Sequence, residues 1–201
     1  MKTRNLSILL ASLFVIAGAV FAADARAEGE VVPVAIGSTI EDFTLPDADN
    51  KEHSLKSLAG KNGTVLIFIA VQCPVSNAYN ERMAKLAEDY NAKGIAIIGI
   101  NSNVAEDCAA VKAHAAEHKL SFPILKDAGN KIADRLGASV TPEAYFIDMN
   151  NKLLYHGRID NARNAAQIET NDLRNALDAA LGGKTIEKTE AKAFGCTIKR
   201  A

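Results

Sequence analysis

Two buried strands with a helix between them constrain the fold more than any other feature of this sequence. The apolar, β-branched run at residues 64–70 predicts a strand, and a helical pattern at residues 74–91 follows it. A second apolar run at residues 95–100 predicts another strand. Because a helix connects them, the two strands are expected to lie parallel in one sheet. The sequence therefore predicts an α/β fold.

The patterns in the rest of the chain extend this sheet and cover it. Two alternating runs around a turn at residues 149–151 predict an antiparallel hairpin. Parallel strands followed by a hairpin give a mixed sheet with helices on both faces. The other expected elements are an entry strand at 40–46, a helical turn within 51–60, a short connector at 122–125, and helices at 104–118, 130–136 and 172–181. The helix at 104–118 is interpreted as an insertion into this alternation of strands and helices.

The first 27 residues have the layout of a secretory signal peptide. Lys2 and Arg4 precede an apolar stretch at residues 6–22, and an A-x-A cleavage site follows at residues 25–27. The stretch is short for a membrane anchor, which is the alternative. We therefore expect an exported protein, periplasmic or extracellular, with no stable membrane anchor after cleavage.

Removal of residues 1–27 leaves about 170 residues, enough for one domain with a sizeable core. The net charge moves from −1 to −3, because three basic residues and one acidic residue are removed. This balance gives no basic surface for nucleic acid. We expect one domain at residues 28–183 and a polar C-terminal tail at residues 184–201.

Cys73 lies where the first buried strand ends and the following helix begins. Unpaired backbone N–H groups and the positive end of the helix dipole favour the thiolate, which is the reactive form of cysteine. Pro74 suits the first helical position, where a missing N–H costs nothing. The alternative is a buried cysteine that only fills space. The context favours a reactive cysteine.

The sequence contains three cysteines, so at least one is free, modified or paired between chains. Cys108 lies on an apolar stripe of its expected helix, with Val104 and Val111, and is interpreted first as a core residue. A role as the partner of Cys73 stays open for it. Cys196 lies in the polar tail after Phe194, and the alternative to pairing is an unpaired thiol on a flexible segment.

Several short motifs from about Ile36 to the C-terminus have the order and spacing of one known family. They are residues 36–37, 42–46, 73–79, 99–103, 136–138, 140–143, 157–160 and 194–198. On these motifs the chain resembles the redoxins, the alkyl hydroperoxide reductase/thiol-specific antioxidant branch of the thioredoxin superfamily, and in particular exported bacterial members. The resemblance implies a thioredoxin-like fold and an enzyme that is a thiol–disulfide oxidoreductase or thiol peroxidase.

The resemblance also implies roles for individual residues. Thr141-Pro142 matches the cis-proline site, whose loop faces the reactive cysteine and seats an extended substrate; an ordinary trans proline is the alternative. Tails with a resolving cysteine recur among redoxins, so Cys196 is expected to resolve the mixed disulfide or sulfenic acid formed on Cys73. The expected substrates are protein or small-molecule disulfides, or peroxides, and an external thiol donor would reduce the enzyme.

Two departures from the family pattern bear on the reaction. Ser76 stands where a dithiol thioredoxin has its second cysteine, so Cys73 cannot close the usual short-loop disulfide. Leu66 and Ala70 replace the proline and threonine that precede a peroxidatic cysteine, which weakens the thiol peroxidase alternative. Arg158 is a weaker candidate for stabilising the thiolate, and a solvated hairpin end is its alternative.

No cofactor or metal is expected. Residues 114–118 match the H-x-x-E-H pattern of one class of zinc proteases, but a third ligand and the protease scaffold are not evident. A copper-binding chaperone module with the same fold is the non-enzymatic alternative. Asn77 occupies the place of its second cysteine and Met149 stands near its expected histidine, so the thiolate pair that copper favours is missing.

Overall fold

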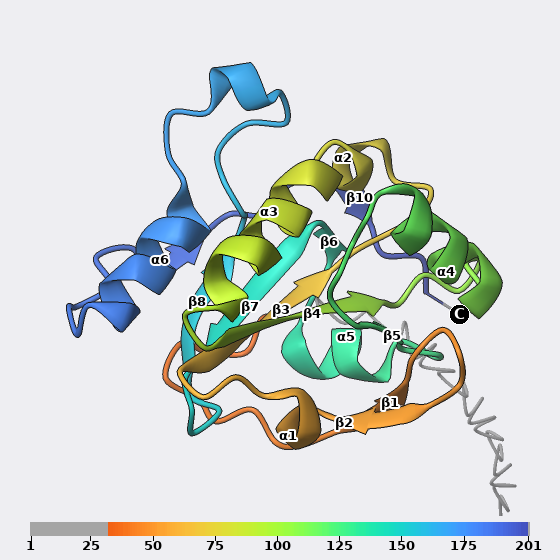
Figure 1. Ribbon diagram of the computed structural model, residues 1–201, viewed down its shortest axis with the longest axis horizontal. Helices are drawn as coiled ribbons and strands as arrows, with labels where there is room; N and C mark the ends of the chain where they lie inside the picture. The colour runs from red at the N-terminus through yellow and green to blue at the C-terminus, as the bar shows by residue number, and fades with distance from the viewer. Residues whose placement is uncertain (1–31, 201) are drawn as a thin grey trace, which may run out of the picture. The chain divides into compact units, whose positions relative to one another are not determined.

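In the computed structural model of the protein, residues 32–200 are described, and they form a sheet covered by helices on both faces (Figure 1). The central sheet has six strands in the order β5-β4-β3-β7-β8-β9. β3, β4 and β5 are parallel, and β7 is antiparallel to both β3 and β8. The predicted mixed sheet is therefore confirmed. Its strands are β3 (Gly63–Phe68), β4 (Ile95–Asn101), β5 (Ile124–Lys126), β7 (Glu143–Ile147), β8 (Leu153–Gly157) and β9 (Glu190–Ala191).

The helices form two layers. One core cluster packs α3 (Asn80–Asn91), α4 (Cys108–Glu117) and α6 (Asp172–Leu181) on one face of the sheet. A second cluster packs α1 (Leu55–Leu58), α5 (Lys131–Leu136) and the small β1–β2 hairpin on the other face. The remaining elements are β1 (Thr44–Pro46), β2 (Glu52–Ser54), α2 (Pro74–Asn77), β6 (Val140–Thr141), the 3₁₀ turn η1 (Ala165–Gln167) and β10 (Cys196–Thr197).

β3 contributes to both cores because successive side chains of a strand point to opposite faces. Val65 and Ile67 belong to the first cluster, and Leu66 and Phe68 belong to the second. All four side chains are fully buried. A strand buried on both faces has a continuous apolar run rather than an alternating one, which is why its sequence was recognisable.

Three expected elements differ in the structure. The helix at residues 74–91 is two helices, α2 and α3, which separate at the buried Tyr79. The connector at residues 122–125 overlaps the start of β5, whose three residues are too few to show a pattern. The helix expected at residues 104–118 starts at Cys108, because the Asp107 side chain caps it by accepting the Ala110 N–H at 2.8 Å.

The later start of α4 changes the expected apolar stripe. Val104 is 57% exposed in the loop before the helix, and Cys108 is only partly buried. Val111 is buried as expected, and His114, a polar residue, shares its face. The interpretation of Cys108 as a core residue of this stripe was therefore wrong.

The structure describes the C-terminal segment up to residue 200 but not the first 31 residues. The signal peptide expected at residues 1–27 lies outside the described residues. Within residues 32–200, no helix is long and apolar enough to cross a membrane. The C-terminal segment forms two strands: β9 adds to the central sheet beside β8, and β10 pairs with β6. The segment is therefore built into the domain.

Candidate active site

Cys73 caps the N-terminus of α2, at the end of the short loop that follows β3. Its Sγ accepts the Ser76 N–H at 3.2 Å, and Pro74 occupies the first helical position, as expected. The side chain is nearly buried, with 4% exposure. The strand and the proline thus place the sulfur at the edge of the sheet where β3 and β4 both end.

The pKa of Cys73 lies below that of an ordinary cysteine, as predicted. Burial raises this pKa, but a hydrogen bond with the Cys196 thiol, the side chain of Thr141 and the Ser76 N–H together outweigh burial. α2 has only four residues. Individual hydrogen bonds therefore stabilise the thiolate of Cys73, and the bond with the Cys196 thiol contributes most. A helix this short contributes little through its dipole.

Cys196 lies directly beside Cys73. Strand β10 is antiparallel to β6, and Cys196 pairs with Thr141. Its hydrogen bond to Cys73 raises the pKa of Cys196, and burial raises it further. Of the two thiols, Cys73 is therefore the one that loses its proton first. Both cysteines are free thiols in this structure.

The cis-proline loop contacts both cysteines. The Thr141–Pro142 peptide bond is cis, which confirms the prediction. The Cys73 thiol lies 3.4 Å from the carbonyl oxygen of Thr141. The Thr141 Oγ1 is buried and accepts or donates no hydrogen bond among residues 32–200. It lies near enough to Cys73 to lower the pKa of that thiol.

Glu143 holds the cis-proline loop in place. Its buried carboxylate accepts the N–H groups of Ser139 and Val140 at 2.8 and 3.1 Å. The Nε2 of His156 lies 2.6 Å from the same carboxylate, and the Tyr145 hydroxyl donates to it at 3.3 Å. Burial raises the pKa of Glu143, but the hydrogen bonds from His156 and the two N–H groups lower it below the ordinary value.

Glu106 supports the loop that carries Cys73, and the sequence analysis did not single it out. Its carboxylate is 2% exposed and accepts the N–H groups of Val71 and Gln72, each at 2.9 Å. Asn101 and Asn103 also donate to it. A signal was available, because residues that follow adjacent parallel strands meet at one edge of the sheet.

These elements enclose a pocket of about 230 Å³ over the two sulfurs. Lys126, from the end of β5, donates to the Asn101 side chain at 2.7 Å and so joins the network of Glu106 to the third parallel strand. The pocket is lined by Gln72, Cys73, Asn103, Ala105, Glu106, Cys196, Thr197 and Lys199. It therefore opens onto both cysteines, and most of its exposed lining is apolar.

The secondary candidates are placed differently. Ser76 is fully buried beside Cys73, and its hydroxyl accepts the Ala70 N–H at 3.2 Å. Cys108 begins α4 and does not line the pocket. Arg158 also lies outside the pocket lining, and its Nε bonds Asp172 at 2.7 Å.

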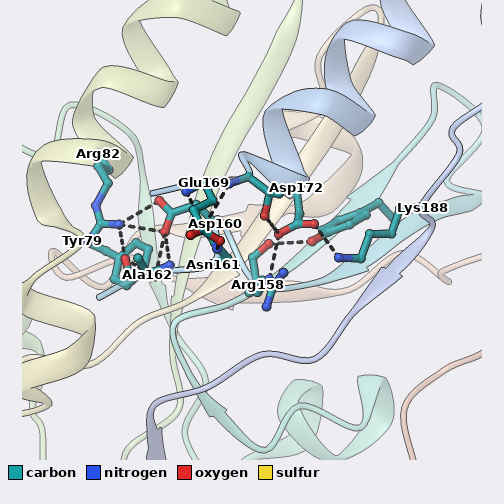
Figure 2. Close-up of polar contacts among 11 residues, drawn as sticks. Tyr79, Arg82, Arg158, Asp160, Asn161, Ala162, Glu169, Asp172 and Lys188 are labelled. Carbon is teal, nitrogen blue, oxygen red and sulfur yellow. Dashed lines mark hydrogen bonds and ion pairs between the residues drawn. The ribbon is translucent and has the colours of Figure 1, made fainter. Parts of the chain in front are cut away.

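Figure 2 shows the network to which Arg158 belongs. Lys188 bonds the second oxygen of Asp172 at 2.7 Å. A neighbouring cluster joins Arg82 and Tyr79 to Asp160. These contacts hold the segment after β8 against α3 and α6. The role of Arg158 in this network is therefore structural.

The two histidines of the H-x-x-E-H pattern lie side by side on α4, with ring centroids 4.4 Å apart. The Asn80 side chain lies 3.2 Å from His114 Nε2. Within the described part of the chain, no three His, Cys, Asp or Glu side chains are grouped as metal ligands would be.

A mixed sheet with a low-pKa cysteine at the end of a buried strand, facing a cis-proline, defines a thioredoxin-like redoxin. The chain belongs to the AhpC/TSA family, which matches residues 36–156. The resemblance seen in the sequence is therefore confirmed.

Similar proteins agree with this assignment. The thiol-disulfide oxidoreductase ResA of Geobacillus thermodenitrificans is 32% identical over 76% of this chain and 83% of its own length. The chloroplastic peroxiredoxin Q of Triticum aestivum is 30% identical over 61% of this chain and 58% of its own length. A hypothetical protein from Sinorhizobium meliloti 1021 has a similar structure, with a TM-score of 0.78, 34% identity and coverage of 85% and 97% of the two chains. These likenesses confirm the predicted class, a thiol–disulfide oxidoreductase.

Proposed function

We propose that the protein is an exported thiol–disulfide oxidoreductase in which Cys73 is the nucleophile and Cys196 is the resolving cysteine. The observation that carries this proposal is the position of Cys196 opposite Thr141, where the Cys196 thiol forms a hydrogen bond with Cys73. Export rests on the signal-peptide pattern of residues 1–27. The activity rests on the thiol pair and on the family.

The reaction takes place in two exchange steps. The Cys73 thiolate attacks one sulfur of a substrate disulfide, forms a mixed disulfide and releases the other half as a thiolate, which takes a proton. Cys196 loses its proton and attacks the Cys73 sulfur, which releases the second thiol and leaves a Cys73–Cys196 disulfide. The substrate gains two electrons and two protons, and an external dithiol returns them to the enzyme.

Cys196 is more exposed than Cys73, so exposure alone would favour Cys196 as the nucleophile. Trapping the mixed disulfide tests which cysteine attacks first. After addition of one equivalent of a disulfide, Cys196→Ser protein should retain a mixed disulfide on Cys73, as detected by intact-mass analysis. Cys108→Ser protein is the matched control and should resolve it. A stable adduct on Cys196 in Cys73→Ser protein, with none on Cys73 in Cys196→Ser protein, would reverse the roles.

A second candidate function is a thiol peroxidase using the same cysteines. The observation in its favour is the free Thr141 hydroxyl beside Cys73, which can donate to a peroxide oxygen in place of the threonine missing at Ala70. The thiolate would take one oxygen from the peroxide and become a sulfenic acid, and Cys196 would displace water from it. Peroxide consumption with a dithiol donor tests this function, and Thr141→Val protein should be slower.

A further inference from the structure

We propose that strand β10 makes Cys73 selective for low-molecular-weight disulfides by occupying the strand edge that an extended polypeptide would use. This inference rests on the proposed role of Cys73 as nucleophile. Extended peptides bind by adding a strand to an open sheet edge. Beside Cys73 that edge belongs to β6, and the chain's own residues fill it.

The pairing of β10 fills the edge of β6 that lies beside Cys73. Cys196 and Thr197 pair with Thr141 and Val140, and the Ile198 N–H donates to the Ser139 carbonyl at 3.0 Å. Paired strands lie about 4.8 Å apart, so an incoming strand would need the volume that β10 fills. Figure 1 shows β10 between α2 and β6.

Contacts on the C-terminal side of Cys196 hold the strand in place. Ile198 is 5% exposed and packs in the second core cluster. Lys199 donates its N–H to Asn103 at 2.7 Å, and Arg200 bonds Asp134 at 2.8 Å. The polar composition of this segment suggests a flexible tail. In the structure these contacts instead hold the tail against the rest of the domain.

Gly195 permits the close approach on the other side of Cys196. A Cβ at this position would lie 1.9 Å from the Thr141 carbonyl oxygen and 3.3 Å from the Pro142 nitrogen. Since these are backbone atoms of the cis-proline loop, no side-chain movement relieves the clash. Substitution of Gly195 therefore separates β10 from β6 without replacing either cysteine.

The remaining access to Cys73 suits a small molecule. The pocket volume of about 230 Å³ corresponds to about eight water molecules in the liquid. This is below the range of about 300–1,000 Å³ that is usual for ligand pockets. One half of a small disulfide fits it, whereas a polypeptide reaches Cys73 only after β10 is displaced.

The test compares two disulfides with the same cysteine chemistry. One is the dimer of N-acetylcysteine amide, and the other is the dimer of an unstructured peptide with one central cysteine. Cys108→Ser/Cys196→Ser protein limits the reaction to the first attack by Cys73, whose rate is followed by release of the thiol. Gly195→Ala is added to this protein. The matched control is Lys192→Ala, which changes an exposed side chain in the segment before β10 and does not alter the pocket lining.

With Gly195 present, the small dimer should react about tenfold faster or more, because the peptide must first break at least two backbone hydrogen bonds of β10. Gly195→Ala should remove most of this difference by accelerating the peptide alone, and Lys192→Ala should not. Ile198→Ala, which removes the buried anchor, should act in the same direction as Gly195→Ala.

Equal rates for the two dimers with Gly195 present would overturn the inference. An equal acceleration of both dimers by Gly195→Ala would also overturn it, because β10 would then shield Cys73 without selecting a substrate. Reaction of Cys73 with neither dimer in any variant would overturn the proposed function itself, and this inference with it.

Discussion

Cys196 lies opposite Thr141 in an antiparallel strand pair, which holds its thiol against that of Cys73. The hydrogen bond shared by the two sulfurs has opposite effects on them. It lowers the pKa of Cys73 and raises that of Cys196. The same contact therefore favours the thiolate at Cys73 and the protonated thiol at Cys196.

The first prediction concerns this shared hydrogen bond. In Cys108→Ser protein, adding Cys196→Ala should raise the pKa of Cys73 towards that of an ordinary cysteine, because the largest stabilising contact of the thiolate is lost. The rate of alkylation at neutral pH should fall accordingly. Ultraviolet absorbance of the thiolate against pH measures the change. Cys196→Ser retains a donor and should give a smaller rise; an unchanged pKa in the alanine variant would contradict the account.

The second prediction concerns the loop before Cys73. Glu106→Gln should destabilise the protein by about 2 kcal/mol, because the amide cannot accept all the N–H groups that the buried carboxylate accepts. It should also slow attack by Cys73, whose loop loses its support. Urea unfolding and alkylation rates measure the two effects. Glu117→Gln, on the exposed side of α4, is the control, and equal stability of the two variants would count against the role of Glu106.

The third prediction concerns stability against pH at the cis-proline loop. The pKa of Glu143 is lowered in the folded protein, so its stabilising contribution is present above the pKa of the unfolded state and is lost as pH falls through the folded value. Glu143→Gln should therefore cost about 2 kcal/mol at neutral pH. The difference from the unsubstituted protein should shrink in acid, below about pH 4.5. Urea unfolding at several pH values tests this, and a difference that grows in acid would have the wrong sign.

The fourth prediction separates structural from catalytic charge. Arg158→Ala should lower stability by about 1–3 kcal/mol, because the buried Asp172 loses a charged partner. The alkylation rate of Cys73 should stay within about twofold, because Arg158 does not line the pocket. A large loss of reactivity with unchanged stability would restore Arg158 as a candidate for stabilising the thiolate.

The sequence carried enough information for the parts of the fold that have long patterns. β3 and β4 are buried on both faces, the β7–β8 hairpin has a clear turn, and α6 has the predicted bounds. β5, β9 and β10 have only two or three residues each, so no periodicity distinguishes them from loops. In the segment that contains β10, the isolated apolar Ile198 was the available sign that the chain is anchored.

The candidate site was predictable to a similar degree. The position of Cys73 between strand and helix indicated a reactive cysteine, and the resemblance to redoxins supplied Cys196 and the cis-proline. Glu106 was missed because an acidic residue in a loop has the same sequence signature whether it is solvated or, as here, buried against backbone N–H groups. Its place in the chain after β4, at the sheet edge where β3 also ends, was the available sign that it lies near the Cys73 loop.

Mapping of disulfides in the fully oxidised protein tests the central claim most directly. The protein is oxidised, remaining thiols are alkylated, and the digested peptides are identified by mass under non-reducing conditions. The account predicts a peptide that joins Cys73 to Cys196, with Cys108 alkylated. A peptide that joins Cys73 to Cys108, or an alkylated Cys196 after complete oxidation, would contradict the account.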